Sequence, residues 1–561
     1  MSDTSKKQNF LHGAALLAIA TAVVKLIGAF YKIPLKMIIG DQGYGYFTTA
    51  YDIYSVLLMI STAGLPIAMS RMISQSSSLG RYNEVRQVYK TSRAIFLGLG
   101  VVSTALMLVG CRWLANLLEQ PDAWAAIACL APCALLMCIM SAYRGFFQGQ
   151  ENMRPTSNSQ MIEAVFKLIV GLGAAFAIMT LTSDIALAAG GAILGVTVSC
   201  LVSVFYLRAK FLPDYQELAQ SQEKPQTFGA TTKSLLAIAV PITIGSAGLQ
   251  LLTVVETGVY MDRLVSLLDG NQFTQPLIGL LETEILAANP NLPAGDLSNK
   301  VAANLKGIYN FAQTIFNMPC AFIIPITISA LPAITSHLAL KNDHAVRSTE
   351  ESAARITGLL SLPCAVGLAI LAGPVMGLLG GYTGLKLELA RQIMAFLGAS
   401  VFFYAIIQYT NAVLQSHNLA HVPVINMLLC GVAKLVIVYI LVGNPAIGIL
   451  GAPMGTLACY LGIALLNLFA ISRLIPQKPK LLKNLLRPLP AAALMGAAVY
   501  GCYHGLILLL GADSSRIILC GVPVCVGVVV YFVCAALFKS ITREDCLLLP
   551  KGEKIAKLLH L

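Results

Sequence analysis

Three lysines lie on one side of a long apolar segment near the start of the chain. Residues 10–40 read FLHGAALLAIATAVVKLIGAFYKIPLKMIIG, which is long enough for a helix to cross a hydrocarbon core of roughly 30 Å. Lys25 lies near the middle, Lys32 follows seven residues later and Lys36 four residues after that. Because a lysine in the middle of a bilayer costs a few kcal/mol, it normally faces a wet cavity or an ionic partner. The segment therefore predicts a membrane protein with a cationic interior that receives an anion.

A purely structural role for the same lysines is also consistent with the sequence. Lys32 lies nearer the expected outer face and can extend its ammonium group to the interface, while Lys25 can pair with an acid such as Glu256. Glu256 and Asp52 are the candidate counter-ions, and the functional alternative for them is a coupling site for an ion or a proton. The two roles are compatible, since a substrate phosphate would displace a carboxylate from its lysine.

The composition places these residues in a polytopic α-helical membrane protein. Of the 561 residues, 57% are hydrophobic and only 11% are charged, which excludes a soluble globular protein. The apolar segments are about 20–30 residues long, which excludes an outer-membrane barrel. The net charge of +12 is explained by cytoplasmic loops that face anionic lipid, so no nucleic-acid partner is expected. The 14 cysteines and 7 histidines form no CxxC or HExxH motif, and we expect no metal site, disulfide framework or cofactor.

Hydropathy predicts fourteen membrane spans, with both chain ends in the cytoplasm. Lysine and arginine gather in the segments assigned to the inside, and the predicted outer segments carry few bases and several acids. The one turn without a lysine or arginine lies near Gln415. The apolar run after the N-terminal tail is too long for a signal peptide, so we expect it to be retained. The predicted spans are 10–39, 46–72, 88–112, 122–148, 157–181, 185–208, 231–260, 304–336, 348–375, 386–415, 421–443, 446–472, 485–508 and 514–538.

The chain also repeats itself. LPIAMSR at residues 65–71 matches LPAITSH at residues 331–337, and FKLIV near Lys167 matches AKLVI near Lys434, at shifts of 266 and 267 residues. LLAIA recurs at a shift of 219, and an insertion accounts for the difference. Two parallel six-helix lobes of this kind commonly enclose a midplane site, which is the architecture of a transporter. The predicted division is an N-lobe at 1–215, a C-lobe at 216–475 with an external loop at 264–300, two appended helices within 476–540, and an amphipathic cytoplasmic tail at 541–561.

Several motifs resemble one transporter superfamily. KLIGAFYKIPL, GDQGYGYF and STAGLPIAMSR, together with six plus six plus two spans, resemble the multidrug/oligosaccharidyl-lipid/polysaccharide exporter superfamily. The resemblance is greatest to its polysaccharide-biosynthesis branch, which includes stage V sporulation protein B and the MurJ-type lipid II flippases. It covers nearly the whole chain, and its motifs are specific to the family but not to a substrate.

The resemblance implies a central cavity in which cationic residues hold the diphosphate of an undecaprenyl-linked sugar. Its two first-helix basic positions match Lys25 and Lys32, on either side of Gly28. The family's arginines in the second and eighth helices are absent here, because those positions fall near residues 58–59 and 314. Either the lysines suffice, or Arg71 and Arg263 at neighbouring helix ends replace them. The resemblance also implies that the last two helices help to form a groove for the lipid tail.

Other polar residues within the predicted spans have structural explanations as well. Glu163 and Lys167 are four residues apart on one helix and are expected to form an ion pair. Lys434 is the repeat equivalent of Lys167, but Cys430 stands where an acid would be, so we favour a structural role within each lobe. Arg71 suits a topology anchor as well as a gate.

These observations favour a flippase that moves lipid II or a related polysaccharide unit from the inner to the outer leaflet of a bacterial plasma membrane. The expected partners are the lipid-linked oligosaccharide, membrane lipids and the cell-wall synthesis machinery, in growth, cell shape or sporulation. The sequence shows no Walker motif, so the membrane potential, an H⁺ or Na⁺ gradient, or removal of the product would drive transport. The alternatives are a drug/cation antiporter of the same superfamily, which needs more buried acids, and a membrane-bound transferase, which needs a catalytic outer loop.

Overall fold

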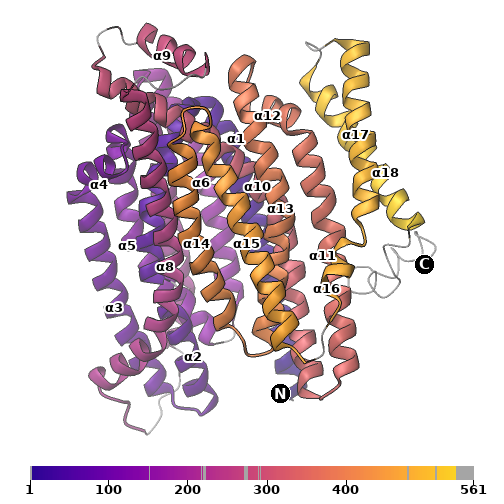
Figure 1. Cartoon of the computed structure of the whole chain (residues 1–561). Coiled ribbons are helices and arrows are strands. Elements are labelled where there is room, and N and C mark those ends of the chain that lie inside the picture. Colours follow the sequence, from indigo (N-terminus) through magenta and orange to yellow (C-terminus); the bar gives the residue numbers. More distant parts are fainter. Residues whose placement is uncertain are drawn as a thin grey trace. The chain divides into compact units, whose positions relative to one another are not determined.

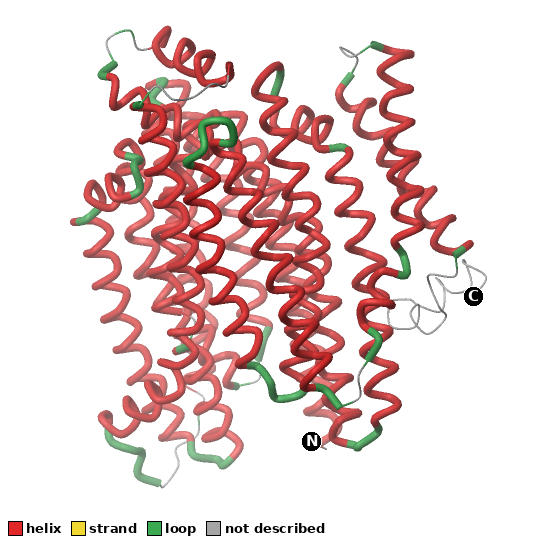
Figure 2. The backbone as a smooth tube through the Cα atoms, viewed as in Figure 1, coloured by secondary structure: helices red, strands yellow, loops and turns green. Residues whose placement is uncertain are grey.

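The computed structural model describes an all-helical chain (Figures 1 and 2). It describes residues 3–62, 64–150, 152–216, 218, 223–270, 276–288, 290, 292–476, 479–511 and 515–538. Within the helices, the side chains of residues 3–22, 25–26, 29, 60–62, 241–242, 244–249, 294, 324–333, 336 and 339 are outside this set. The predicted cytoplasmic tail at 541–561 also lies outside the described residues.

The chain divides into two compact units. The first comprises residues 1–271 and 281–310, and the second comprises residues 272–280 and 311–561. The first unit contains α1 (Asp3–Thr62), α2 (Leu65–Ser78), α3 (Tyr82–Val109), α4 (Cys111–Leu117), η1 (Pro121–Ala123), α5 (Trp124–Gly149), α6 (Arg154–Thr182), α7 (Ile185–Gln216), α8 (Phe228–Asp269), and parts of α9 (Pro276–Ala288) and α10 (Ala294–Ala339).

The second unit contains the rest of α9 and α10 and all the later helices. These are α11 (Asp343–Ile370), α12 (Ala372–Gly380), α13 (Gly384–Ser416), α14 (His421–Val442), η2 (Gly448–Leu450), α15 (Gly451–Leu474), α16 (Leu481–Leu486), α17 (Leu489–Leu510) and α18 (Arg516–Leu537). The apolar core of this unit lies among α11, α13 and α15, and α17 packs beside α18 (Figure 1).

Among the described residues, ten helical segments are long and apolar enough to cross a membrane. They coincide with ten of the predicted spans, so a multi-pass α-helical membrane protein is confirmed. The other four predicted spans lie in α1, α2, α8 and α10, whose side chains are described only in part. The total of fourteen therefore stays a prediction. The ten segments are 82–109, 121–149, 154–182, 185–216, 343–370, 384–416, 421–442, 448–474, 481–510 and 516–537.

The boundary between the first two predicted spans differs from the structure. No loop separates them, because α1 runs to Thr62 and only Gly40, at φ 67°, interrupts its helical geometry. That positive φ is costly for residues other than glycine, so Gly40 sets the position of the kink. The second predicted span instead breaks at Gly64, where the chain passes so close to α8 that a Cβ would collide with the Ala239 carbonyl oxygen.

The segment predicted as an external loop contains helices. Residues 264–300 are mostly helical, because α8 continues to Asp269, α9 spans Pro276–Ala288 and α10 begins at Ala294. The compact units also differ from the predicted lobes, since α8 and the start of α10 belong to the first unit. Compactness and sequence repetition are different criteria, so the two-lobe division stays a prediction.

Candidate functional site

A buried lysine and its partners form the polar centre of the first unit. The side chain of Lys306 on α10 has no exposed area, and its Nζ lies 3.1 Å from Asp52 Oδ2 on α1. The same ammonium donates a hydrogen bond of 2.6 Å to Thr49 Oγ1. A charged amine without water needs such partners, because an unpaired charge in this environment costs several kcal/mol. Asp52 is therefore the counter-ion of Lys306. The sequence predicts Asp52 as a counter-ion but does not single out Lys306.

The spacing of the residues explains how the two helices make these contacts. Thr48, Thr49 and Asp52 lie within one turn of α1, and Asn310 follows Lys306 by one turn on α10. Asn310 Nδ2 donates to Thr48 Oγ1 at 2.7 Å, which extends the polar contact along the helices. The helix backbones approach closely because glycines remove the side chains that would separate them. A Cβ on Gly307 would collide with the Asp41 carbonyl oxygen.

The helix α8 completes the surroundings of Asp52. Thr257 Oγ1 donates to Asp52 Oδ2 at 3.4 Å, and Gln250 Nε2 donates to Ser55 Oγ at 2.6 Å, one turn further along α1. Glu256, the predicted counter-ion of the first-helix lysines, is buried beside Thr257 and interacts electrostatically with Tyr260. The structure therefore places the predicted coupling acids Glu256 and Asp52 at the same level of the first unit.

Two further lysines carry positive charge next to this centre. Lys32 on α1 interacts electrostatically with Lys167 on α6 and with Asp52. Lys167 Nζ lies 5.4 Å from the centroid of the Tyr31 ring and 5.0 Å from that of Tyr51. Among the described residues, neither lysine forms a salt bridge. Lys306 and Lys32 thus both face the carboxylate of Asp52, while the Lys167 ammonium lies against two aromatic rings.

The predicted ion pair between Glu163 and Lys167 is wrong. Glu163 Oε2 instead lies 3.1 Å from a terminal guanidinium nitrogen of Arg144 on α5. Arg144 Nε also donates to Ser159 Oγ at 3.0 Å, which fixes the guanidinium between α5 and α6. A planar guanidinium with several donors can hold Glu163 Oε2 and Ser159 Oγ at once. The ammonium of Lys167 instead lies against two aromatic rings. Because Glu163 pairs with Arg144, Lys167 adds its positive charge to that of Lys32, and the two lysines form a cationic surface.

The remaining candidates lie apart from these contacts or cannot be placed. The side chain of Lys25 is outside the described residues. Lys36, the third lysine of the opening segment, is buried and pairs with Asp41 at 3.3 Å across the Gly40 kink. Its charge is therefore already neutralised.

The two arginines proposed as replacements make none of the contacts given above. Arg71 is exposed on α2, and Arg263 lies near the end of α8. Lys434 on α14 belongs to the second unit, so it is not part of this cluster.

Lys306 could have been found in the sequence. It stands three residues into the predicted span 304–336, and Asn310 follows at the next turn, so a charge and an amide share one helix face in an apolar segment. Its partner could not be predicted, because Asp52 lies 254 residues earlier in the chain. In the described part of the chain, no group of three His, Cys, Asp or Glu side chains is arranged to hold a metal ion.

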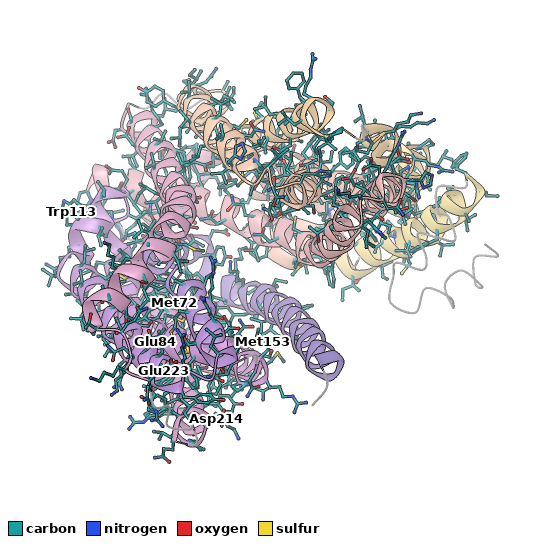
Figure 3. The ribbon with its side chains drawn as sticks, turned by 90° about the horizontal axis from the view of Figure 1, so that it is seen from below. Met72, Glu84, Trp113, Met153, Asp214 and Glu223 are labelled. Carbon is teal, nitrogen blue, oxygen red and sulfur yellow. The ribbon has the colours of Figure 1, made fainter. Side chains whose placement is uncertain are left out.

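The connection from α7 to α8 is attached to the turn between α2 and α3. Arg81 Nε lies 2.9 Å from Glu223 Oε2, and the backbone N–H of Gln226 donates to Glu84 Oε2 at 2.7 Å. Together with Met72 these residues line a polar pocket of about 200 Å³. Figure 3 shows Met72, Glu84 and Glu223 gathered on this face of the first unit. The connector is therefore held by the first unit at the predicted cytoplasmic side.

An apolar groove lies in the second unit. It has a volume of about 420 Å³ and is formed by α11, α17 and α18, with Pro319 of α10. Its walls are aliphatic and aromatic side chains, including Leu360, Val528 and Phe532. Such a lining suits a hydrocarbon chain and offers no site for a charged group.

The sequence matches two protein-family models. Residues 10–338, more than half of the chain, match the family described as "Polysaccharide biosynthesis protein". Residues 296–508 match the family described as "Lipid II flippase MurJ".

Three curated relatives from Bacillus subtilis (strain 168) cover most of the chain. Stage V sporulation protein B is 24% identical, over 85% of this chain and 86% of its own length. The uncharacterized membrane protein YabM is 26% identical, over 99% of this chain and 97% of its own length. Lipid II flippase MurJ is 23% identical, over 87% of both chains.

Two solved structures show the same fold. The inward closed conformation of a lipid II flippase MurJ has a TM-score of 0.63 and 14% sequence identity, and the match covers 93% of this chain and 98% of that one. An inward-facing multidrug resistance MATE family transporter has a TM-score of 0.60 and 14% identity, covering 82% and 99%. At these identities, the likeness concerns the fold alone.

Proposed function

We propose that this chain, which belongs to the polysaccharide biosynthesis protein family of the multidrug/oligosaccharidyl-lipid/polysaccharide exporter superfamily, is a lipid flippase. Its substrate is an undecaprenyl-diphosphate-linked cell-wall precursor, which it moves from the inner to the outer leaflet. The family is one of membrane transporters, so the protein is a transporter and not an enzyme. The precursor is lipid II or a related polysaccharide unit, and transport proceeds by alternating access.

The observation that carries this proposal is that Lys32 and Lys167 interact with each other while neither forms a salt bridge to a described residue. Two like charges that interact in a partly desolvated site raise each other's free energy, and an anion relieves this repulsion. A diphosphate carries about two negative charges, and moving it unpaired through a low-dielectric region would cost many kcal/mol. The lysines offer matching charge without the bidentate grip of arginine, which suits a substrate that must be released.

The neighbouring side chains hold this cationic surface in position. The Tyr31 hydroxyl donates to the Ala192 carbonyl oxygen of α7 at 3.1 Å, which fixes the ring that lies against Lys167. Asp52 remains paired with Lys306 while it also attracts Lys32. We therefore assign Asp52 the role of counter-ion when no substrate is bound, and Asp52 or Glu256 the role of coupling acid if H⁺ or Na⁺ drives transport.

The apolar groove of the second unit suits the prenyl chain. Its hydrocarbon lining has the character that the resemblance implies for the last two helices. In this proposal the charged headgroup meets the lysines while the prenyl chain remains in an apolar environment, so neither part of the lipid is placed in an unfavourable medium.

Depletion in a host that lacks other flippases tests the proposed substrate. When the protein is depleted, lipid-linked precursor should accumulate in the inner leaflet, and re-expression should return it to the outer leaflet. Leaflet-resolved labelling of the precursor measures both states. An unchanged distribution after depletion would contradict the proposal, and dye efflux on re-expression would indicate a cation antiporter instead.

A further inference from the structure

A second pocket in the first unit has both a cationic and an apolar end. It lies between α3, α5 and α7 and has a volume of about 160 Å³. Arg93, Arg208, Tyr89 and Tyr143 contribute its polar side chains. None of them belongs to the lysine cluster, so the flippase proposal leaves this pocket unexplained.

The two arginines of this pocket have unused hydrogen-bonding capacity. Arg93 and Arg208 are exposed, and neither makes a salt bridge or a hydrogen bond to the described part of the chain. Other arginines on the same side of this unit are occupied, since Arg81 pairs with Glu223 and Arg86 donates to the Leu218 carbonyl oxygen. Arg93 and Arg208 therefore present two guanidinium groups to one cavity without a protein anion between them.

Tyrosine hydroxyls lie beside these guanidinium groups. Tyr89 and Tyr143 line the same pocket. Each tyrosine hydroxyl is a neutral O–H donor. The polar end therefore combines charge and neutral donors, a combination that suits the oxygens of a phosphate group.

The apolar end lies one helical turn deeper on each of the three helices. On α3 Arg93 is followed by Leu97, on α5 Tyr143 is preceded by Ile139, and on α7 Arg208 is preceded by Phe205. Since α3 runs opposite to α5 and α7 in the predicted topology, all three steps lead towards the membrane centre, by about 5 Å. Phe205 is 63% exposed, so an aromatic ring faces the surroundings just below the arginines. The pocket thus changes from polar to apolar as a lipid does at the headgroup boundary.

We propose that this pocket binds an anionic phospholipid of the inner leaflet. The guanidinium groups of Arg93 and Arg208 hold the phosphate diester, the tyrosine hydroxyls donate to its oxygens, and an acyl chain packs along Phe205. Basic pockets between membrane helices on the cytoplasmic side are suited to anionic headgroups, and arginine forms two parallel hydrogen bonds to a phosphate. The proposal stands apart from the flippase activity, because it concerns α3, α5 and α7 only.

Lipid binding by the purified full chain tests this proposal. Native mass spectrometry would measure binding of phosphatidylglycerol and of phosphatidylcholine with the same acyl chains. The variant Arg93→Gln/Arg208→Gln should lose at least tenfold in affinity for phosphatidylglycerol, with phosphatidylcholine unchanged. The matched control is Lys90→Gln/Lys210→Gln, because both lysines are exposed on the same helices and do not line the pocket. The control should retain the affinity of the unmodified chain.

Three outcomes would overturn the assignment. Equal losses in both double variants would mean that surface charge alone attracts the lipid. Binding of phosphatidylcholine as tight as that of phosphatidylglycerol would remove the role of the anion. Competition by inorganic phosphate alone, with no effect of Phe205→Ser, would mean a free-phosphate site rather than a lipid site. The arginines are exposed, so the variants should fold, and melting curves without added lipid check this.

Discussion

Loss of the Lys306 ammonium should destabilise the protein by an amount that depends on Asp52. Removing one partner of a buried ion pair costs about 3–5 kcal/mol, because the other charge stays buried alone. Lys306→Met leaves Asp52, whose side chain is 23% exposed and keeps some hydration. The expected cost is therefore at the lower end, about 3 kcal/mol. Asp52→Asn leaves an ammonium with no exposed area, so its cost should lie near the upper end, about 5 kcal/mol.

The double variant Asp52→Asn/Lys306→Met provides the decisive comparison. Because it removes both charges together, its cost should be smaller than that of either single change. Unfolding of the detergent-solubilised protein would give the three differences in free energy. Arg391→Gln is the control, since Arg391 and Glu388 are about half exposed and such a pair is worth about 1 kcal/mol or less. Additive costs of the two single changes would refute the assigned pairing.

Two further predictions concern helix packing and the corrected ion pair. Gly195→Ala should destabilise the first unit by about 1–3 kcal/mol or more, since the new Cβ would collide with the backbone of Gly171. Gly173→Ala should be nearly neutral, because that position has open space around it. Thermal unfolding would compare the two variants, and equal effects would contradict the packing of α6 on α7. Arg144→Gln should lower stability more than Lys167→Gln, because Arg144 holds Glu163. Only Lys167→Gln should reduce precursor binding while the fold is retained. A larger loss of stability in Lys167→Gln than in Arg144→Gln would restore the sequence-based pairing.

The general fold could be predicted from the sequence because lipid imposes simple rules. Long apolar segments must be helical, so ten spans were located correctly. The predicted spans differ from the structure where the backbone at a single glycine decides whether a helix bends, breaks or continues. Gly40 produces a kink and not a loop, and the second predicted span contains an additional break at Gly64, where α8 passes close by. Hydropathy averages over many residues and does not detect such a contact.

The candidate site could be predicted in its charge but not in its pairing. Lys32 and Asp52 are predicted because ionisable groups are rare in apolar spans, and the structure brings them near Lys167, for which the sequence favours a structural role. Partner choice depends on distances between helices that are remote in sequence. Asp52 is paired by Lys306, and the local spacing of Glu163 and Lys167 was misleading because Arg144 on the adjacent helix offers better geometry.

The central claim is that Lys32 and Lys167 bind the diphosphate of the transported lipid. The most direct measurement is translocation of an undecaprenyl-diphosphate-linked precursor by the full chain in proteoliposomes, with Lys32→Gln/Lys167→Gln compared with Lys90→Gln/Lys210→Gln. Both variants lose the same charge, but only the first changes the cluster beside Asp52. The account predicts that translocation and precursor binding fall at least tenfold in the first variant and stay unchanged in the second. Normal translocation by a correctly folded Lys32→Gln/Lys167→Gln variant would contradict it.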